Sequence, residues 1–155
     1  MKLATYRVNG AAPRIGVVHS GDRRLFDLAA AASRSSLSDA PFSSMIALMD
    51  AGSQGLDLAR DLFARRRDEE DLSVALEDAT LLAPVPEPRQ MRDGMSFPTH
   101  IRQSGRGMRR LLAANDPQAL AAIEAEPLPP LADVYRQLPI YYITNRLIVR
   151  GPGAT

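Results

Sequence analysis

An aspartate and a histidine stand seven residues apart in the window from Gln90 to Arg102. The carboxylate of Asp93 could hold a hard cation through oxygen, and His100 could carry a proton near neutral pH. A structural interpretation competes with this one, because Asp93 could cap a turn or the following helix and His100 could be an ordinary helix residue. Most pairs at this spacing are accidental, so the residues taken alone favour the structural interpretation and leave the catalytic one open.

The sequence lacks the residues and motifs of several other kinds of catalytic or binding site. The chain has no cysteine, which excludes disulfides, thiolate metal sites and cysteine nucleophiles and gives no argument for an oxidising compartment. It contains no glycine-rich dinucleotide motif, phosphate-binding loop, G-x-S-x-G elbow or H-E-x-x-H pair. The two histidines are too far apart in sequence to indicate a zinc site, and His19, beside Ser20 and Gly21, is interpreted as a plain surface histidine.

Charge and hydropathy narrow the expected partners. Nineteen basic and eighteen acidic residues leave a net charge of +1 over 155 residues, so no overall field favours nucleic acid or an anionic membrane as a partner. No uncharged run approaches the roughly 18 apolar residues of a membrane span, and the start lacks the apolar core of a signal peptide. We therefore expect a cytoplasmic protein without a nucleic-acid or membrane partner.

The elements that would carry these residues begin with a β-meander. Alternating residues predict strands over 3–8, 14–19 and 24–28, joined by turns at 9–10 and 20–22. Such a small sheet needs a second layer. Helices are predicted to supply it. The first follows Asp39 and Pro41, buries the side chains of residues 42, 45, 46 and 49, and stops at Gly52; the second spans 56–67.

Prolines at 84, 86 and 88 hold the next segment extended and indicate a domain boundary. The predicted domains are an N-terminal α+β domain over 1–78 and a second, incomplete domain over 79–155. Helices are expected near 98–114 and after Asp116, and strands over 140–143 and 146–149. The fold class is therefore α+β: a small N-terminal β-meander with helices, followed by the truncated start of a mainly-β domain, or by a sheet that something else completes.

Several segments, in their order and spacing, resemble the fumarylacetoacetate hydrolase family. The resemblance covers nearly the whole chain and is carried by residues 1–6, 16–18, 25–28, 81–86, 91–100, 139–142 and 149–153. It implies that residues 79–155 begin the family's catalytic domain. Intact members of the family are expected to be homodimers.

The resemblance also implies roles for individual residues. His100 falls at the catalytic histidine that activates water, and Asp93 at an aspartate that ligates a divalent cation, Mg²⁺ or else Mn²⁺ or Ca²⁺. Tyr142 matches a substrate-contacting tyrosine. Arg109 matches an arginine that reaches the substrate carboxylate, with Arg106 as a rival for that role.

Two departures from the family pattern bear on function. Met95 stands where the hydrolases proper carry a substrate-binding tyrosine, which leaves the native substrate open. The family's other metal carboxylates are expected beyond Thr155, and Glu124 and Glu126 are interpreted as solvated helix surface. The metal site is therefore expected to be incomplete, and the isolated chain inactive.

The implied activity is metal-dependent hydrolysis of a C–C bond in an acylpyruvate or another 1,3-dicarbonyl acid, as in the catabolism of aromatic compounds. Related members decarboxylate, hydrate or isomerise 2-oxo acids. The expected partner is thus a small oxo acid. The alternative is a non-catalytic binding or interaction module that a partner chain completes.

Overall fold

The computed structural model describes residues 1–153 and has the predicted α+β fold. It divides into two compact units. The first consists of Met1–Arg89 together with the C-terminal residues from Arg146, and the second is Gln90–Asn145. None of the helices in residues 1–153 is long and apolar enough to cross a membrane.

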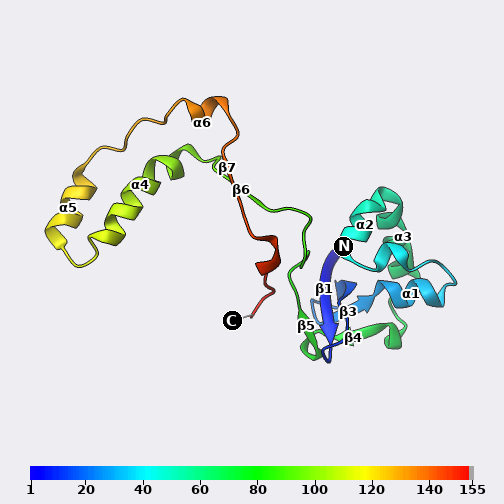
Figure 1. The fold of residues 1–155 in the computed structure, drawn as a ribbon. Coiled ribbons are helices and arrows are strands. Elements are labelled where there is room, and N and C mark those ends of the chain that lie inside the picture. The colour runs from blue at the N-terminus through cyan, green and yellow to red at the C-terminus, as the bar shows by residue number, and fades with distance from the viewer. Residues whose placement is uncertain (154–155) are drawn as a thin grey trace. The chain divides into compact units, whose positions relative to one another are not determined.

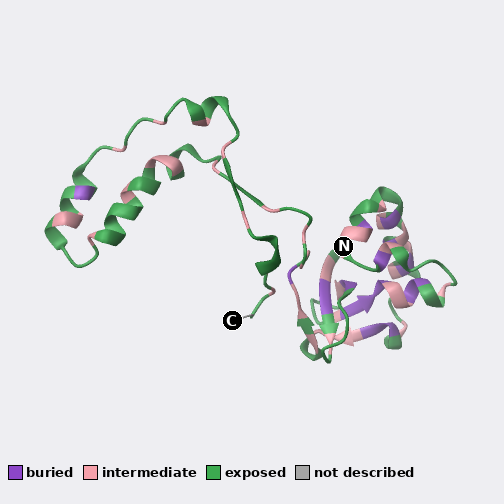
Figure 2. Ribbon diagram, in the orientation of Figure 1, coloured by how far each residue is buried: buried purple, intermediate pink, exposed green. Residues whose placement is uncertain are grey.

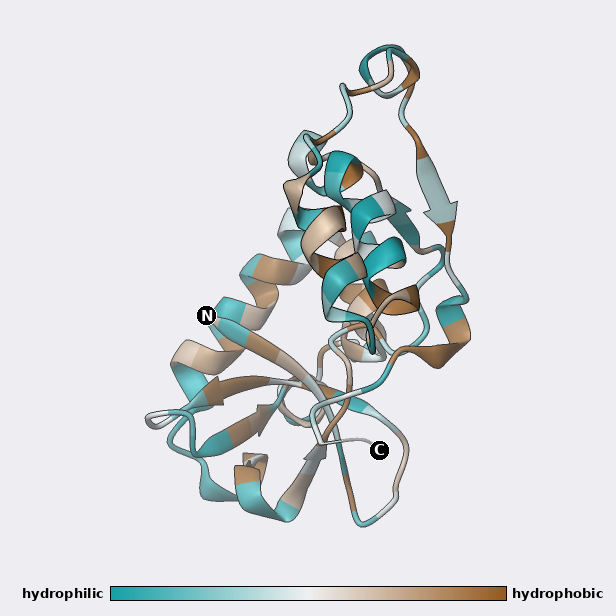
Figure 3. Ribbon diagram, turned by 90° about the vertical axis from the view of Figure 1, so that its left-hand side faces the viewer, coloured by the Kyte–Doolittle hydropathy of each residue, from teal (hydrophilic) through white to brown (hydrophobic). Residues whose placement is uncertain are grey.

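The first unit is built on a five-stranded antiparallel sheet with the strand order β4-β3-β2-β1-β5. Its strands are β1 (Lys2–Val8), β2 (Arg14–His19), β3 (Arg24–Asp27), β4 (Ser73–Ala75) and β5 (Ala79–Leu81) (Figure 1). Asn9 and Gly10 both have positive φ and form a tight turn, closed by the Ala11 N–H donating to the Val8 carbonyl at 3.0 Å, within the five-residue connection from β1 to β2. The predicted meander is confirmed, and hydrophobic residues run along its strands (Figure 3).

The strand order requires the sheet to curl. β4 and β5 occupy opposite edges, yet only the 3₁₀ turn η3 (Leu76–Asp78) separates them. Four residues of chain from Ala75 to Ala79 reach at most about 14 Å, whereas four strand spacings in a flat sheet span about 19 Å. The edges must therefore approach each other, and Val8 at the end of β1 lines the same pocket as β4 residues 73–75.

The first helix, α1 (Leu28–Arg34), replaces the end of the predicted third strand. The Asp27 carboxylate accepts a hydrogen bond from the N–H of Ala30 at 2.9 Å and caps the helix. A run of four alanines then favours helix over strand. The strand prediction was wrong at Leu28 because this cap was overlooked.

The next predicted helix is split in two. The 3₁₀ turn η1 (Ala40–Phe42) is followed by α2 (Met45–Asp50), where the Ser44 side chain accepts from the N–H of Ala47 at 3.1 Å. This new start rotates the inward face, so Leu48 is 4% exposed and Met49 57%. The placement of Met49 in the core was wrong for that reason. α2 does stop before Gly52, which has φ +60° and opens α3 (Gly52–Arg66).

The core of the first unit lies between the sheet and these helices (Figure 2). The 3₁₀ turn η2 (Glu70–Leu72) contributes Leu72 to it. Its buried members are Ile15, Val17, Phe26, Leu28, Ala31, Ala32, Phe42, Leu48, Ala59, Leu62 and Leu72.

A buried polar group accompanies this core. Asp27 binds the Arg14 guanidinium at 2.7 Å and is 6% exposed, and Tyr6 is buried beside it. Burial, with the Asp27 charge as a second cause, raises the pKa of Tyr6 well above its ordinary value of 10.0. The phenol is therefore neutral in the folded unit at any physiological pH.

The second unit contains two short strands and three helices, so the expected mainly-β character of this part of the chain was wrong: its helices outweigh its three-residue strands. β6 (Arg92–Gly94) pairs antiparallel with β7 (Tyr141–Ile143), and between them lie α4 (Pro98–Leu112), α5 (Pro117–Ala125) and α6 (Val134–Gln137). Local signals define the first two helices: Pro98 opens α4, and the Asp116 side chain caps α5 by accepting from the N–H groups of Gln118 and Ala119. Among residues 90–145 only Ile123 is buried.

The predicted strand over 146–149 was wrong, because Arg146–Ile148 forms a 3₁₀ turn, η4. A strand needs a neighbour in register, and the β6 ladder pairs Arg92 with Ile143 at its end. The Arg146 guanidinium instead donates to the carbonyl of Pro88 at 3.3 Å. Gly151 follows against Leu81 and Leu82, where a Cβ would lie 2.5 Å from the Leu81 carbonyl oxygen.

The division into compact units falls between Arg89 and Gln90, later than the predicted domain boundary after residue 78. β5 lies beyond that boundary yet pairs with β1, and Thr5 donates to the Pro84 carbonyl at 2.6 Å. A compact unit need not coincide with a domain, so the domains 1–78 and 79–155 stay a prediction.

Candidate functional site

Two of the predicted site residues are brought together in the second unit. Asp93 on β6 lies directly opposite Tyr142 on β7. Residues opposite each other in an antiparallel pair point to the same face, with Cβ atoms about 4.5–5.5 Å apart. Both side chains are exposed. A carboxylate and a phenol from distant parts of the sequence thus share one surface.

The ladder around this pair is held by its neighbours. The Met95 N–H donates to the Ile140 carbonyl at 2.9 Å, beyond the three-residue strands. On the opposite face of the ladder, the Arg92 guanidinium lies 4.7 Å from the centre of the Tyr141 ring, a cation–π contact. Arg92 and Tyr141 are diagonal neighbours, and their contact helps fix the register that sets Asp93 against Tyr142.

A shallow pocket of about 470 Å³ adjoins these strands. Met95 is among its lining residues. The pocket is lined by Arg92, Gly94, Met95, Ser96, Tyr135, Leu138, Pro139, Ile140 and Tyr141. It mixes apolar walls with one cation, a combination suited to a small organic acid.

His100 is the third residue of α4, in the first turn after Phe97 and Pro98. It is exposed and belongs to the same unit as Asp93 and Tyr142. The first turn of a helix leaves backbone N–H groups without helical partners, so His100 stands beside donors that an anion can use.

Arg109 lies elsewhere on α4. Nine residues at about 1.5 Å and 100° each place it roughly 13 Å from His100 along the axis and on the opposite side of the helix. Its guanidinium donates to both carboxylate oxygens of Glu126, at 2.5 and 2.7 Å. This pairing raises the pKa of Arg109 and lowers that of Glu126. In this structure Arg109 ties α4 to the end of α5 and does not reach Asp93 or Tyr142.

The rival Arg106 also faces α5. It donates to the backbone carbonyl of Glu126 and lies 4.0 Å from the Glu124 carboxylate. Arg110 pairs with Glu124 at 3.0 Å. Glu124 and Glu126 are exposed, in agreement with the prediction of helix surface, and each is engaged by arginine.

The donor set for a metal is sparse. Asp93 is the carboxylate of the β6–β7 pair, and within residues 1–153 no three His, Asp or Glu side chains are close enough together to hold an ion. Mg²⁺ prefers near-octahedral oxygen coordination, so Asp93 offers the right kind of atom but only part of a site.

Sequence reasoning missed a second group of residues, in the first unit. His19 is half-buried and is not the plain surface histidine expected. Its Nε2 lies 3.1 Å from Ser73 Oγ and its Nδ1 lies 3.0 Å from Ser20 Oγ. Its ring meets Phe63 edge-on, with 5.4 Å between the ring centres. The signal that could have found it is its place at the end of an alternating strand, but Ser73 and Phe63 come from distant segments.

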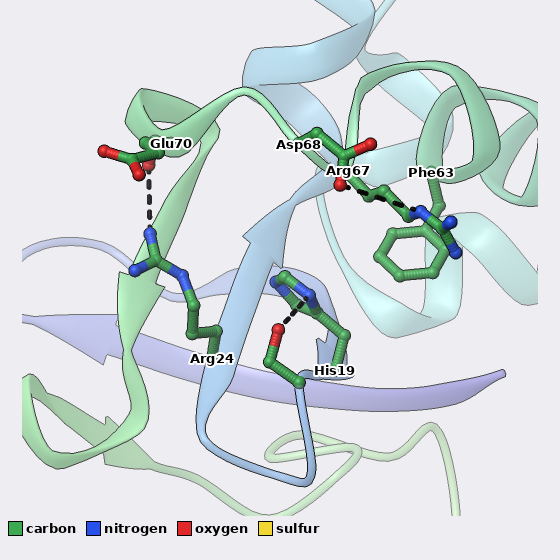
Figure 4. A pocket seen from close by; sticks show the side chains of 7 residues that line it. His19, Arg24, Phe63, Arg67, Asp68 and Glu70 are labelled. Carbon is green, nitrogen blue, oxygen red and sulfur yellow. Dashed lines mark hydrogen bonds and ion pairs between the residues drawn. The ribbon is translucent and has the colours of Figure 1, made fainter.

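His19, Ser20 and Phe63 border an open pocket of about 430 Å³ (Figure 4). It is lined by His19, Ser20, Arg24, Phe63, Arg67, Asp68 and Glu70. Burial, then the charges of Arg24 and Arg67, lower the pKa of His19 below its ordinary value of 6.5, which favours the neutral imidazole.

No protein-family model matches this sequence, and no curated protein matches it significantly.

Proposed function

We propose that this chain belongs to the fumarylacetoacetate hydrolase family and carries the aspartate and histidine part of its catalytic apparatus. The reaction would be hydrolysis of a C–C bond in an acylpyruvate or related 1,3-dicarbonyl acid, or decarboxylation, hydration or isomerisation of a 2-oxo acid. The observation that supports this most directly is the cross-strand pair of Asp93 and Tyr142 in the unit that also carries His100.

The residues have separate tasks in this proposal. His100 accepts a proton from water as it attacks the carbonyl carbon, which raises the nucleophilicity of the water. The Tyr142 hydroxyl hydrogen-bonds the oxo acid and orients it beside Asp93. Met95, in place of a tyrosine, gives the adjoining pocket an apolar wall and favours a substrate with an apolar substituent there.

A divalent cation would supply charge stabilisation at the oxo-acid oxygens. The residues present do not fit a complete Mg²⁺ site, since Asp93 is a single carboxylate. We therefore propose that further carboxylates join Asp93 in the active assembly, a cytoplasmic homodimer whose small-molecule partner is an oxo acid.

Binding experiments on the chain itself test this proposal. Oxalate, a planar mimic of a 2-oxo acid enolate, is titrated with and without Mg²⁺ while amide NMR signals are followed. We expect Mg²⁺-dependent shifts at Asp93, His100 and Tyr142, with millimolar affinity because the ligand set is sparse. Asp93→Ala should remove the Mg²⁺ dependence, and Asp133→Ala, an exposed carboxylate of the same unit, should keep it. Shifts confined to other residues would contradict the assignment.

Kinetics test the roles in the proposed active homodimer, in which further carboxylates join Asp93. His100→Ala should lower kcat about 10²–10⁴-fold with little change in KM, because base assistance acts in the transition state. Arg109→Ala should chiefly raise KM if it contacts the substrate carboxylate, and should have little effect if its only role is the pairing with Glu126. An unchanged kcat for His100→Ala would exclude the histidine from catalysis.

The second candidate is a non-catalytic interaction module. It is favoured by the large exposed side chains of the second unit, among them Phe97, Met108, Leu111, Leu112 and Ile143. Sedimentation velocity together with oxalate titration distinguishes the two candidate functions. An interaction module should self-associate or bind a partner without binding oxalate, whereas an oxo-acid enzyme should bind oxalate.

A further inference from the structure

The open pocket around His19 has the features of an anion site, and neither the proposed function nor the family resemblance uses it. His19 lies between the Arg24 side chain on one side and Phe63 with Arg67 on the other (Figure 4). The residues come from four segments of the first unit: the end of β2, β3, the end of α3 and the turn that follows it. A pocket assembled from so many segments keeps its shape only while the unit is folded.

Arg24 is held in place with donors to spare. Its Nη2 donates to the backbone carbonyls of Glu70 and Ser73, both at 3.1 Å. Within residues 1–153 these are the hydrogen bonds of its guanidinium, so Nε and Nη1 remain available to a ligand. Because Nη2 is already held, the planar guanidinium is oriented, and its Nε and Nη1 groups can donate together to an oxyanion.

Arg67 supplies a second guanidinium at the pocket. Its nearest carboxylate is that of Asp68, 3.9 Å from Nε, and the Asp68 side chain is 97% exposed. A contact this long is no hydrogen bond, and an exposed pair is strongly screened. Arg67 can therefore turn to a ligand without breaking a buried interaction.

Charges of both signs line the pocket, two arginines and two acids. Charges that face His19 come from Arg24 on β3, from Arg67 and Asp68 after α3, and from Glu70 on η2. The two arginines act on the imidazole more strongly than Asp68, which opposes them. An anion beside His19 would therefore be attracted by the two guanidiniums and opposed by Asp68 and Glu70, so binding depends on direct hydrogen bonds from the free arginine donors.

We propose that this pocket binds a small oxyanion, a phosphate or carboxylate group held by Arg24 and Arg67 beside His19. The bound negative charge offsets the two guanidinium charges that disfavour the imidazolium. Protonation of His19 and anion binding therefore favour each other, and the anion binds more tightly as the pH falls. The two serine hydroxyls accept from both ring nitrogens of the charged form, so protonation requires no rearrangement of the ring.

NMR titration of the two histidines tests the proposal on the intact chain. The pKa of His19 is measured in chloride, in sulfate as a non-titrating stand-in for a phosphate group, and in acetate, all at matched ionic strength. We expect sulfate, acetate or both to raise the pKa of His19 relative to chloride, while the ring signals of His100, outside the pocket, respond alike in all three salts. A response to sulfate alone assigns the site to phosphate groups, and a response to acetate extends it to carboxylates.

Variants separate a built site from general attraction. Arg67→Gln should lower the affinity of the pocket for the anion about tenfold, the usual effect of losing one charge-assisted hydrogen bond. It should also raise the pKa of His19 in chloride. Arg65→Gln, two residues away and paired with Asp61 at 2.8 Å, is the matched control and should leave both quantities unchanged. Equal shifts at His19 and His100, no shift at all, or equal effects of the two substitutions would each overturn the proposal.

Discussion

The two compact units of this chain contrast in what holds them together. Of the fifteen buried hydrophobic residues in residues 1–153, fourteen lie in the first unit and Ile123 alone lies in the second. The second unit instead relies on a short strand ladder, helix caps and ion pairs between α4 and α5. The contrast shows that regular secondary structure can arise either from burial or from local signals, and the two origins respond differently to mutation.

The largest expected difference is between two phenylalanines. Phe26 is fully buried and meets Phe63 edge-on, whereas Phe97 is 75% exposed before α4. Phe26→Ala should lower the free energy of unfolding of the first unit by about 3–5 kcal/mol, and Phe97→Ala should change stability by less than about 0.5 kcal/mol. Urea unfolding followed by methyl NMR signals of the core measures both. A large loss of unfolding free energy for Phe97→Ala would mean that Phe97 is buried in a core of the second unit, against the comparison drawn above.

Two glycines give effects of opposite sign. A Cβ at Gly16 would lie 2.5 Å from the Phe26 carbonyl oxygen, while one at Gly107 in α4 meets nothing within 4 Å. Gly16→Ala should destabilise the first unit by about 1–3 kcal/mol through overpacking. Gly107→Ala should stabilise α4 by about 0.5–1 kcal/mol through helix propensity. Amide hydrogen exchange in each unit measures the two changes, and equal signs would contradict the comparison.

Alkaline pH should lower the free energy of unfolding of the first unit through ionisation of Tyr6 in the unfolded chain. The pKa of Tyr6 is raised by burial, so the unfolded chain loses its phenolic proton at a lower pH than the folded unit. Its contribution is fully present below pH 10.0, the ordinary value, and falls above it by up to about 1.4 kcal/mol per pH unit. Urea unfolding between pH 8 and 11.5 should show this slope. Tyr6→Phe should remove it, whereas Tyr142→Phe, exposed in the second unit, should not.

The smallest expected effect concerns the pairing of Arg109 with Glu126. Arg109 lowers the pKa of Glu126, so the pair stabilises the α4–α5 contact above the ordinary glutamate pKa of 4.5 and loses this effect as pH falls through the lowered value. Both groups are exposed, and salt screens them. Arg109→Gln should raise the pKa of Glu126 toward its ordinary value and slightly speed amide exchange in α4 and α5. High salt should do the same there and change the stability of the first unit by a smaller fraction, because that unit has a buried core besides its exposed ion pairs; equal sensitivity of both units would contradict this.

Elements with a strong local pattern were predictable from the sequence. The alternation in β1 to β3, the turn at Asn9 and Gly10, and the Asp116 cap of α5 all act within a few residues. β4 and β5 were not predicted, because three residues carry too little pattern and both strands depend on partners far away in sequence. The strand predicted over 146–149 failed for the converse reason: its residues have strand character, but the ladder of β7 stops at Ile143.

The candidate site divides in the same way. Asp93 and His100 could be picked out from residue type and spacing, but the register that sets Asp93 opposite Tyr142 is a long-range pairing that the sequence does not display. The arginines show the limit most clearly. Arg109 was matched by spacing to a substrate role, whereas its actual neighbour, Glu126, is set by how α5 returns along α4.

The placement of β4 and β5 on opposite edges of the sheet has a consequence for synthesis of the chain. A ribosome releases the β1–β3 meander first, with both outer strands unpaired and open to pairing with other nascent chains. Both are covered only when residues 73–81 emerge, and a single short segment covers them together. The interval of about fifty residues between Asp27 and Leu81 is when the chain is most exposed to aggregation, and a delay in translation before Leu81 would prolong it.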